Sequence, residues 1–93
     1  MLYIRQVRVQ APGSTNQHIT HLKCSGSTGG ALTAVKREVI VRVIDSGYSI
    51  STHNDATGEQ AEVVTRSGSG GRRYLTTLAG GRETNNLLDL PRF

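Results

Sequence analysis

Residues 33–47, TAVKREVIVRVIDSG, decide the fold class of this chain, because their apolar residues suit either a helix or a strand. Val35, Val39 and Val43 recur every four residues, which is the spacing of one stripe along an amphipathic helix. The central run 39–44, VIVRVI, is almost entirely β-branched, and that composition is typical of strands. The spacing and the composition therefore point to opposite structures.

The two ends of this stretch favour the helix. Thr33 is a residue type that caps helix N-termini, and Gly47 is the type that most often follows a helix C-terminus. The length between them also suits a helix better than a strand. We predict a helix over residues 34–46, with Ile40 and Ile44 beside its apolar stripe.

Two strands are predicted before the helix, over residues 2–9, LYIRQVRV, and residues 18–24, HITHLKC. In the first, Ile4 and Val7 stand three residues apart, which places them on opposite faces of a regular strand. Either both faces of this strand are partly buried, or a bulge redirects one of the side chains.

Three further strands are predicted after Gly47, over residues 48–53, 61–66 and 72–78. A turn at 54–58 and a Ser/Gly-rich hairpin loop separate them. The tail with Leu87, Leu88 and Leu90 is too apolar for solvent, so we expect it to lie across the sheet or the helix.

The resulting order is β-β-α-β-β-β, an α+β domain with one helix packed on an antiparallel sheet of about five short strands. The 93 residues make a single domain, residues 1–93, with a light core of one Phe, three Tyr and no Trp. A core of this kind is often supported by self-association, so we expect a homo-oligomer.

The single Cys24 excludes an internal disulfide, and no apolar stretch approaches the roughly 20 residues that span a bilayer. The N-terminus carries arginines within its apolar run, unlike a signal peptide. We therefore expect a soluble, cytoplasmic protein without a membrane partner. The net charge is +4 and nine of the eleven basic residues are Arg, whose planar fork suits phosphate and carboxylate.

The segment Tyr74-Leu75-Thr76-Thr77, followed by NNLLDLP over residues 85–91, resembles the domain-of-unknown-function 3892 family. The resemblance covers nearly the whole chain, and members of that family are small stand-alone proteins. The Gly-rich entry to the predicted helix and the Ser-Gly-Ser-Gly-Gly hairpin depart from the usual pattern. The resemblance implies a fold neighbourhood but no reaction, cofactor or partner.

Three groups of residues are candidates for ligand binding. Arg72 and Arg73 can hold phosphate oxygens while Tyr74 stacks on a base. Paired amides can read a base or sugar edge, and a Gly-rich helix entry can form an anion nest. The full set of candidates is Arg72, Arg73, Tyr74, Thr76, Asn85, Asn86, Gly29, Gly30 and Thr33.

Each group also has a structural interpretation. Arg72 and Tyr74 alternate with Arg73 along a strand, so they face opposite sides, and the ring can belong to the core. The two asparagines can cap a turn, and the glycines can form a plain surface loop.

Other chemistry finds little support. The Gly-rich segment lacks the Gly-Lys-Ser/Thr ending of a P-loop. His18, His21 and Cys24 alternate faces on a strand, so they cannot converge on a zinc ion or form a catalytic pair. We expect no metal, no cofactor and no catalysis. The predicted function is a non-catalytic binding module for a phosphate-bearing ligand, either a nucleotide-like molecule or nucleic acid. The alternatives are a protein-interaction module and, third, an enzyme.

Overall fold

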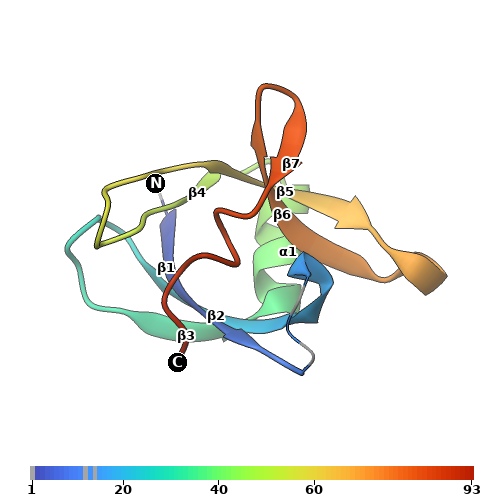
Figure 1. The fold of residues 1–93 in the computed structure, drawn as a ribbon, viewed down its shortest axis with the longest axis horizontal. Coiled ribbons are helices and arrows are strands. Elements are labelled where there is room, and N and C mark those ends of the chain that lie inside the picture. Colours follow the sequence, from blue (N-terminus) through green and yellow to red (C-terminus); the bar gives the residue numbers. More distant parts are fainter. Residues whose placement is uncertain (1, 12, 14) are drawn as a thin grey trace.

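The computed structural model describes residues 2–11, 13 and 15–93, which form a curved seven-stranded sheet with one α-helix (Figure 1). None of the helices in this described part has the length and apolar composition needed to cross a membrane. The elements in chain order are β1 (Leu2–Val9), η1 (Asn16–His18), β2 (Ile19–Ser25), β3 (Thr33–Lys36), α1 (Arg37–Asp45), β4 (Ile50–Thr52), β5 (Glu62–Ser67), η2 (Ser69–Gly71), β6 (Arg73–Ala79) and β7 (Arg82–Thr84).

The strands lie in the order β3-β2-β1-β4-β5-β6-β7. Every neighbouring pair is antiparallel except β1 and β4, which are parallel. The α+β class is therefore confirmed. The predicted count of about five strands is wrong, because β3 and β7 extend the two edges of the sheet.

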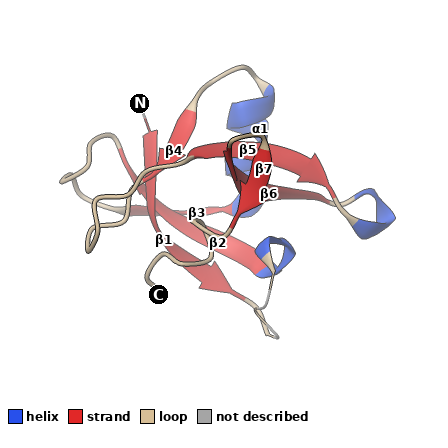
Figure 2. Cartoon of the chain, turned by 45° about the horizontal axis from the view of Figure 1, so that its top comes forward, coloured by secondary structure: helices blue, strands red, loops and turns tan. Residues whose placement is uncertain are grey.

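The sheet curls until strands near its two ends approach the same helix (Figures 1 and 2). Helix α1 contacts β2 and β3 near one end of the strand order, and β5 and β6 near the other. The short 3₁₀ helix η1 also contacts β6. A helix of nine residues is only about 13 Å long, so these four strands must converge around it. This closure forms two seams, at α1 and at η1.

Helix α1 is shorter than predicted because its expected first turn is a strand. Residues 33–36 form β3, in which Thr33 is paired with Cys24 and Lys36 with His21. The helix begins at Arg37, and Lys36 rather than Thr33 is its N-cap residue. The prediction of Thr33 as N-cap is therefore wrong, because pairing with β2 satisfies the backbone of these residues in an extended form.

The buried face of α1 also differs from the predicted valine stripe. Ile40 is 1% exposed, whereas Val39 is 44% exposed. The later start of the helix does not change its periodicity, but the curled sheet covers the face that carries Ile40, with Val43 and Ile44 partly buried beside it.

The C-terminal end of α1 agrees with the sequence. Gly47 has φ +99°, and its N–H donates to the carbonyl of Ile44 at 2.9 Å. The N–H of Tyr48 donates to the carbonyl of Val43 at 3.4 Å. These two bonds form a Schellman motif, which requires the left-handed backbone that glycine adopts without strain.

Strand β1 contains the bulge that was one of the two alternatives. Its pairing with β2 shifts between Ile4 and Gln6, so Arg5 is the extra residue. Ile4 and Val7 are both 0% exposed and belong to the same core. The extra residue lets side chains three apart face one side of the strand.

The C-terminal tail lies beside β1 and closes the core. Leu87 and Leu90 are 0% and 3% exposed. The N–H of Val7 donates to the carbonyl of Pro91 at 3.0 Å, and the N–H of Phe93 donates to the carbonyl of Val7 at 3.1 Å. The tail therefore continues the edge of β1 where β4 has ended. The tail leucines are thus withdrawn from solvent as expected, and Leu88 is partly buried against the same core.

Cys24 is a buried free thiol in the core cluster, 4% exposed. Burial raises the pKa of this thiol to about 11. The thiolate is favoured in the unfolded chain, so folding stability should be unaffected below pH 9 and should fall as the pH rises from about 9 to 11.

We expect Cys24 to react slowly with iodoacetamide at pH 8 in the native protein and quickly in denaturant, because the thiolate is the reactive form. In the Cys24→Ser variant, denaturation measured between pH 9 and 11 should lack this loss of stability. Rapid native labelling would contradict the burial of the thiol.

Candidate functional site

An arginine-lined groove lies where α1 begins beside the start of β6. Its volume is about 470 Å³, and its walls combine the first turns of the helix with the strand that follows the β5–β6 hairpin. The lining residues are Arg37, Glu38, Val41, Arg72 and Arg73. We call this the arginine groove. Three arginines and one glutamate give the lining a formal charge of +2, and Asp45, which is paired with Arg73, lowers the local charge to +1.

Arg37 forms the fixed wall of the arginine groove. Its side chain is only 12% exposed, and Nη1 donates to the backbone carbonyl of Ile19 at 3.1 Å. Nη2 donates to Oε1 of Glu38 at 3.2 Å. These bonds hold the guanidinium at the seam between η1, β2 and the helix.

Glu38 is the anion already present in the groove. Its pKa is lowered, first because the carboxylate accepts its own backbone N–H at the start of α1, and also because of the charge of Arg37. Free N–H groups at a helix N-terminus attract negative charge. Glu38 therefore occupies the position that an external anion would favour.

Arg73 and Arg72 form the opposite wall. Nη2 of Arg73 donates to Oδ1 of Asp45 at 2.7 Å and also to Oγ1 of Thr65, so the side chain is directed toward α1. Arg72 is exposed, and within the described residues its guanidinium has no ion-pair partner. The groove thus combines one free guanidinium with two that are held in place.

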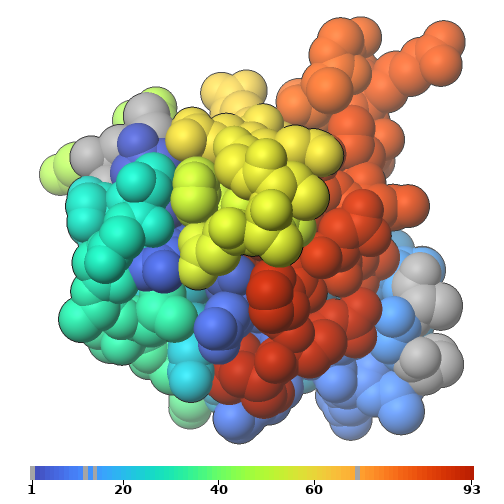
Figure 3. Space-filling view, turned by 60° about the vertical axis from the view of Figure 1, so that its left-hand side comes forward, coloured from blue at the N-terminus to red at the C-terminus, as the bar shows by residue number. Residues whose placement is uncertain are grey.

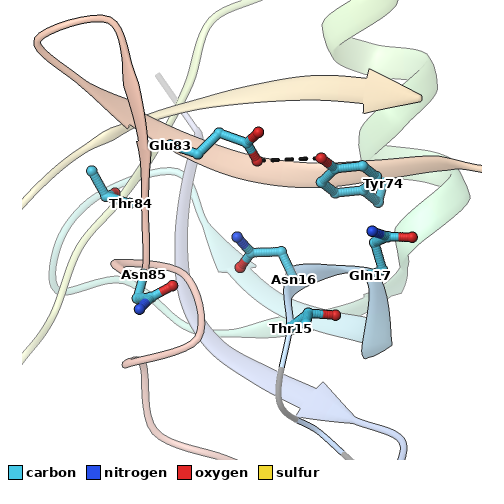
Figure 4. Close-up of a pocket in the computed structure, with 7 residues that line it drawn as sticks. All are labelled: Thr15, Asn16, Gln17, Tyr74, Glu83, Thr84 and Asn85. Atoms are coloured by element: carbon cyan, nitrogen blue, oxygen red, sulfur yellow. Dashed lines mark hydrogen bonds between the residues drawn. The ribbon is translucent and has the colours of Figure 1, made fainter. Parts of the chain in front are cut away.

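A second concavity lies at the seam closed by η1. Its volume is about 220 Å³, and η1, β6 and β7 contribute to its walls (Figure 4). The lining residues are Thr15, Asn16, Gln17, Tyr74, Glu83, Thr84 and Asn85. We call this the polar pocket. The sequence prediction found Tyr74 and Asn85 but missed the residues of η1 and β7.

Asn16 is the buried end of the polar pocket. It is 9% exposed, and its Nδ2 donates to Oγ1 of Thr76 at 2.9 Å. Its Oδ1 is buried and accepts no hydrogen bond from the described residues. Thr76, a predicted ligand-binding residue, is 0% exposed and acts here as the partner that orients Asn16.

Tyr74 and Glu83 form the outer wall of the polar pocket. The Tyr74 hydroxyl donates to Oε1 of Glu83 at 3.3 Å (Figure 4). Burial, followed by the negative charge of Glu83, raises the pKa of Tyr74. The phenol therefore stays protonated and remains a donor at neutral pH.

The two predicted asparagines line different concavities. Asn85 lines the polar pocket, whereas Asn86 lines a third concavity of about 170 Å³. That concavity lies between the 52–59 segment and the C-terminal tail, which adjoin on the face shown in Figure 3. Oδ1 of Asn86 accepts a hydrogen bond from Oγ1 of Thr84 at 2.6 Å. The amide oxygen of Asn86 is thus bonded within the chain.

The helix entry on which the predicted anion nest depends is wrong. Gly29 and Gly30 precede β3, and α1 begins only at Arg37. Their backbone N–H groups therefore belong to a loop and cannot line a helix N-terminus. The carbonyl of Gly30 instead accepts a hydrogen bond from Nη1 of Arg5.

Arg5 organises a polar network that the sequence did not indicate. Its Nε and Nη2 donate to the two carboxylate oxygens of Asp55 at 3.1 and 2.8 Å. Oδ1 of Asp55 lies 3.0 Å from Nδ1 of His53. The hydrogen bonds from Arg5 are the main reason that the pKa of Asp55 is lowered. These bonded groups connect the bulge of β1 to the loop after β4.

The chain has the architecture of a small α+β domain whose curled sheet is closed by one helix and one 3₁₀ turn. The family model described as "Protein of unknown function (DUF3892)" matches residues 3–91, nearly the whole chain. The chain therefore belongs to this family. Comparison with the curated proteins and with the solved structures gave no match.

Proposed function

We propose that this protein is a non-catalytic binding module for a phosphate-bearing ligand, held in the arginine groove. The observation that carries the proposal is that Arg37, from the start of α1, lines one groove together with Arg72 and Arg73, which are distant from it in sequence. Guanidinium forks match the geometry of phosphate oxygens and form charge-assisted hydrogen bonds with them.

The three guanidinium groups would contribute unequally to ligand binding. Arg72 is free to bind the ligand directly, and Arg73 retains N–H donors beyond the Nη2 that Asp45 and Thr65 engage. Arg37 is held by backbone carbonyls and supplies a fixed positive charge. Glu38 competes with the ligand for these guanidinium groups. A ligand therefore binds only if its anionic group interacts with them more favourably than the Glu38 carboxylate does.

The arginine groove is open, which suits either the phosphates of a nucleotide or a stretch of nucleic-acid backbone. The dependence of binding on salt concentration distinguishes these two kinds of ligand. Binding of nucleic acid should weaken steeply as salt is added, in proportion to the phosphates contacted. Binding of a nucleotide should depend less on salt and should raise the melting temperature.

We expect the double variant Arg72→Ala/Arg73→Ala to weaken binding of pyrophosphate, nucleotides or single-stranded oligonucleotides at least about 10-fold, because each charge-assisted contact contributes about 1.5–3 kcal/mol before exposure reduces it. Calorimetry or fluorescence anisotropy at fixed salt would measure the change. Glu38→Gln should bind more tightly than the parent protein, since it removes the competing carboxylate.

Arg82→Ala is the matched control, because Arg82 is exposed on β7 and lies outside the groove lining. It removes one positive charge, half of the change in the double variant, and should leave affinity nearly unchanged. If Arg82→Ala weakened ligand binding equally, the net charge of the protein rather than the arginine groove would explain the binding. If the protein bound none of pyrophosphate, nucleotides and single-stranded oligonucleotides, the proposal would be wrong.

We also propose a homo-oligomer, since the core is light and the groove is open on one side. Native mass spectrometry of freshly purified protein would report the number of subunits and any co-purified ligand together. A strictly monomeric spectrum across the micromolar range would rule out the oligomer without affecting the arginine groove.

A further inference from the structure

We propose that the polar pocket is a second binding site, separate from the arginine groove, for a flat N–C–N group that presents adjacent N–H donors. Guanine bases and guanidinium groups share this chemistry. The proposal does not rest on the phosphate-binding function, because none of the residues that line one concavity lines the other.

The buried end of the pocket requires a donor. Asn16 Oδ1 is buried without a donor from the described residues, while the other end of the same amide is fixed on Thr76. A buried acceptor that stays unpaired is costly, and such groups in folded proteins call for a specific explanation. Figure 4 shows the Asn16 amide directed toward the segment that carries Thr84 and Asn85, across the pocket. The atom has almost no exposed surface, so an N–H group of a ligand reaches it only if a neighbouring side chain shifts on binding.

The outer wall supplies the complementary acceptor. Glu83 is the only charged side chain among the described residues that line the pocket, and Arg66, the cross-strand neighbour of Tyr74, lies close outside the lining. Its Oε1 accepts the Tyr74 hydroxyl, and a carboxylate has further lone pairs available on both oxygens. Two parallel N–H···O bonds between a carboxylate and an N–C–N group are a strong, geometrically specific pairing. The pocket therefore selects donors rather than anions.

The size of the pocket restricts the ligand to one flat group. A volume of about 220 Å³ admits a single or fused ring but leaves no room for a whole nucleotide. Gln17 lies tightly against Gly68, where an added Cβ would come within 2.5 Å of Oε1 of Gln17. This close packing fixes the side of the pocket next to Tyr74. A planar group can enter beside the phenol ring with its donor edge toward Asn16 and Glu83.

The test is a titration of the ¹⁵N-labelled protein with three probes, in which the amide chemical shifts are measured. Guanosine carries the complete donor edge, inosine lacks the exocyclic amino group, and L-argininamide carries a guanidinium. We expect guanosine or L-argininamide to shift the amides of Asn16, Tyr74 and Glu83. Inosine should bind at least about 10-fold more weakly than guanosine, because it leaves an acceptor unpaired. Guanosine binding alone would identify a base as the ligand, and L-argininamide binding alone would identify a guanidinium.

Variants of exposed residues keep the test independent of folding. Glu83→Gln should weaken binding at least about 10-fold, since it removes the charge and one acceptor. Glu62→Gln is the matched control, because Glu62 is exposed on β5 outside the pocket. Arg72→Ala/Arg73→Ala should bind guanosine normally, which separates this site from the arginine groove. Equal binding of inosine and guanosine, unchanged binding by Glu83→Gln, or no shift with any probe would overturn the proposal.

Discussion

Replacement of Leu87 by Ala is expected to lower the free energy of unfolding by about 2–5 kcal/mol. The side chain is 0% exposed and belongs to the core cluster, so its removal leaves a cavity as well as losing apolar burial. A domain of this size has a total stability of only about 5–15 kcal/mol. The variant should therefore be partly unfolded at physiological temperature, which denaturation followed by circular dichroism would measure.

Leu88→Ala is the matched control for Leu87, because it removes the same atoms from the next residue of the tail. Leu88 is only partly buried, so its loss should cost clearly less than that of Leu87. Equal costs would mean that the tail does not pack as described. A loss below about 1 kcal/mol at Leu87 would show that the core does not depend on the tail.

Replacement of Ile40 by Ala should also cost about 2–5 kcal/mol, whereas Val39→Ala should change stability by less than about 0.5 kcal/mol. Ile40 is 1% exposed and lies against the curled sheet, while Val39 is 44% exposed. Alanine also favours the helix more than valine does, which offsets the small loss of burial at Val39.

The same pair of variants tests the orientation of α1. Urea denaturation of both proteins, with unchanged slopes against denaturant concentration, would give the two costs directly. The valine stripe predicted from the sequence, with Ile40 beside it, would instead give a loss at Val39 at least as large as the loss at Ile40. That outcome would refute the helix orientation and the position of the arginine groove, since Arg37 and Glu38 are on the same helix.

Local signals explain the parts of the fold that the sequence predicted. The β-branched run 2–9 forms β1, and the Gly47 terminus forms because glycine alone adopts φ +99° without strain. The start of α1 could not be predicted in this way. Residues 33–36 have no strand signal stronger than their helix signal, and only pairing with β2 decides between them.

The candidate sites, like the fold, could be predicted from the sequence only in part. Arg72 and Arg73 were recognisable as residues suited to anions, but nothing in the sequence indicates that Arg37 joins them. Asn16 lies in a loop sequence between two strands, where a polar residue is expected to be exposed. It is buried only because η1 closes on β6, where its amide is bonded to Thr76.

The sequence by itself determined the α+β class, the positions of most strands, the end of the helix and the apolar tail, because caps, turns and periodicity act over a few residues. The tertiary structure alone decided which face of the helix is buried and which polar residues meet. Those outcomes depend on the curvature that brings β2 and β3 against the same helix as β5 and β6. Curvature of a sheet results from many long-range pairings together, and no short stretch of sequence contains it.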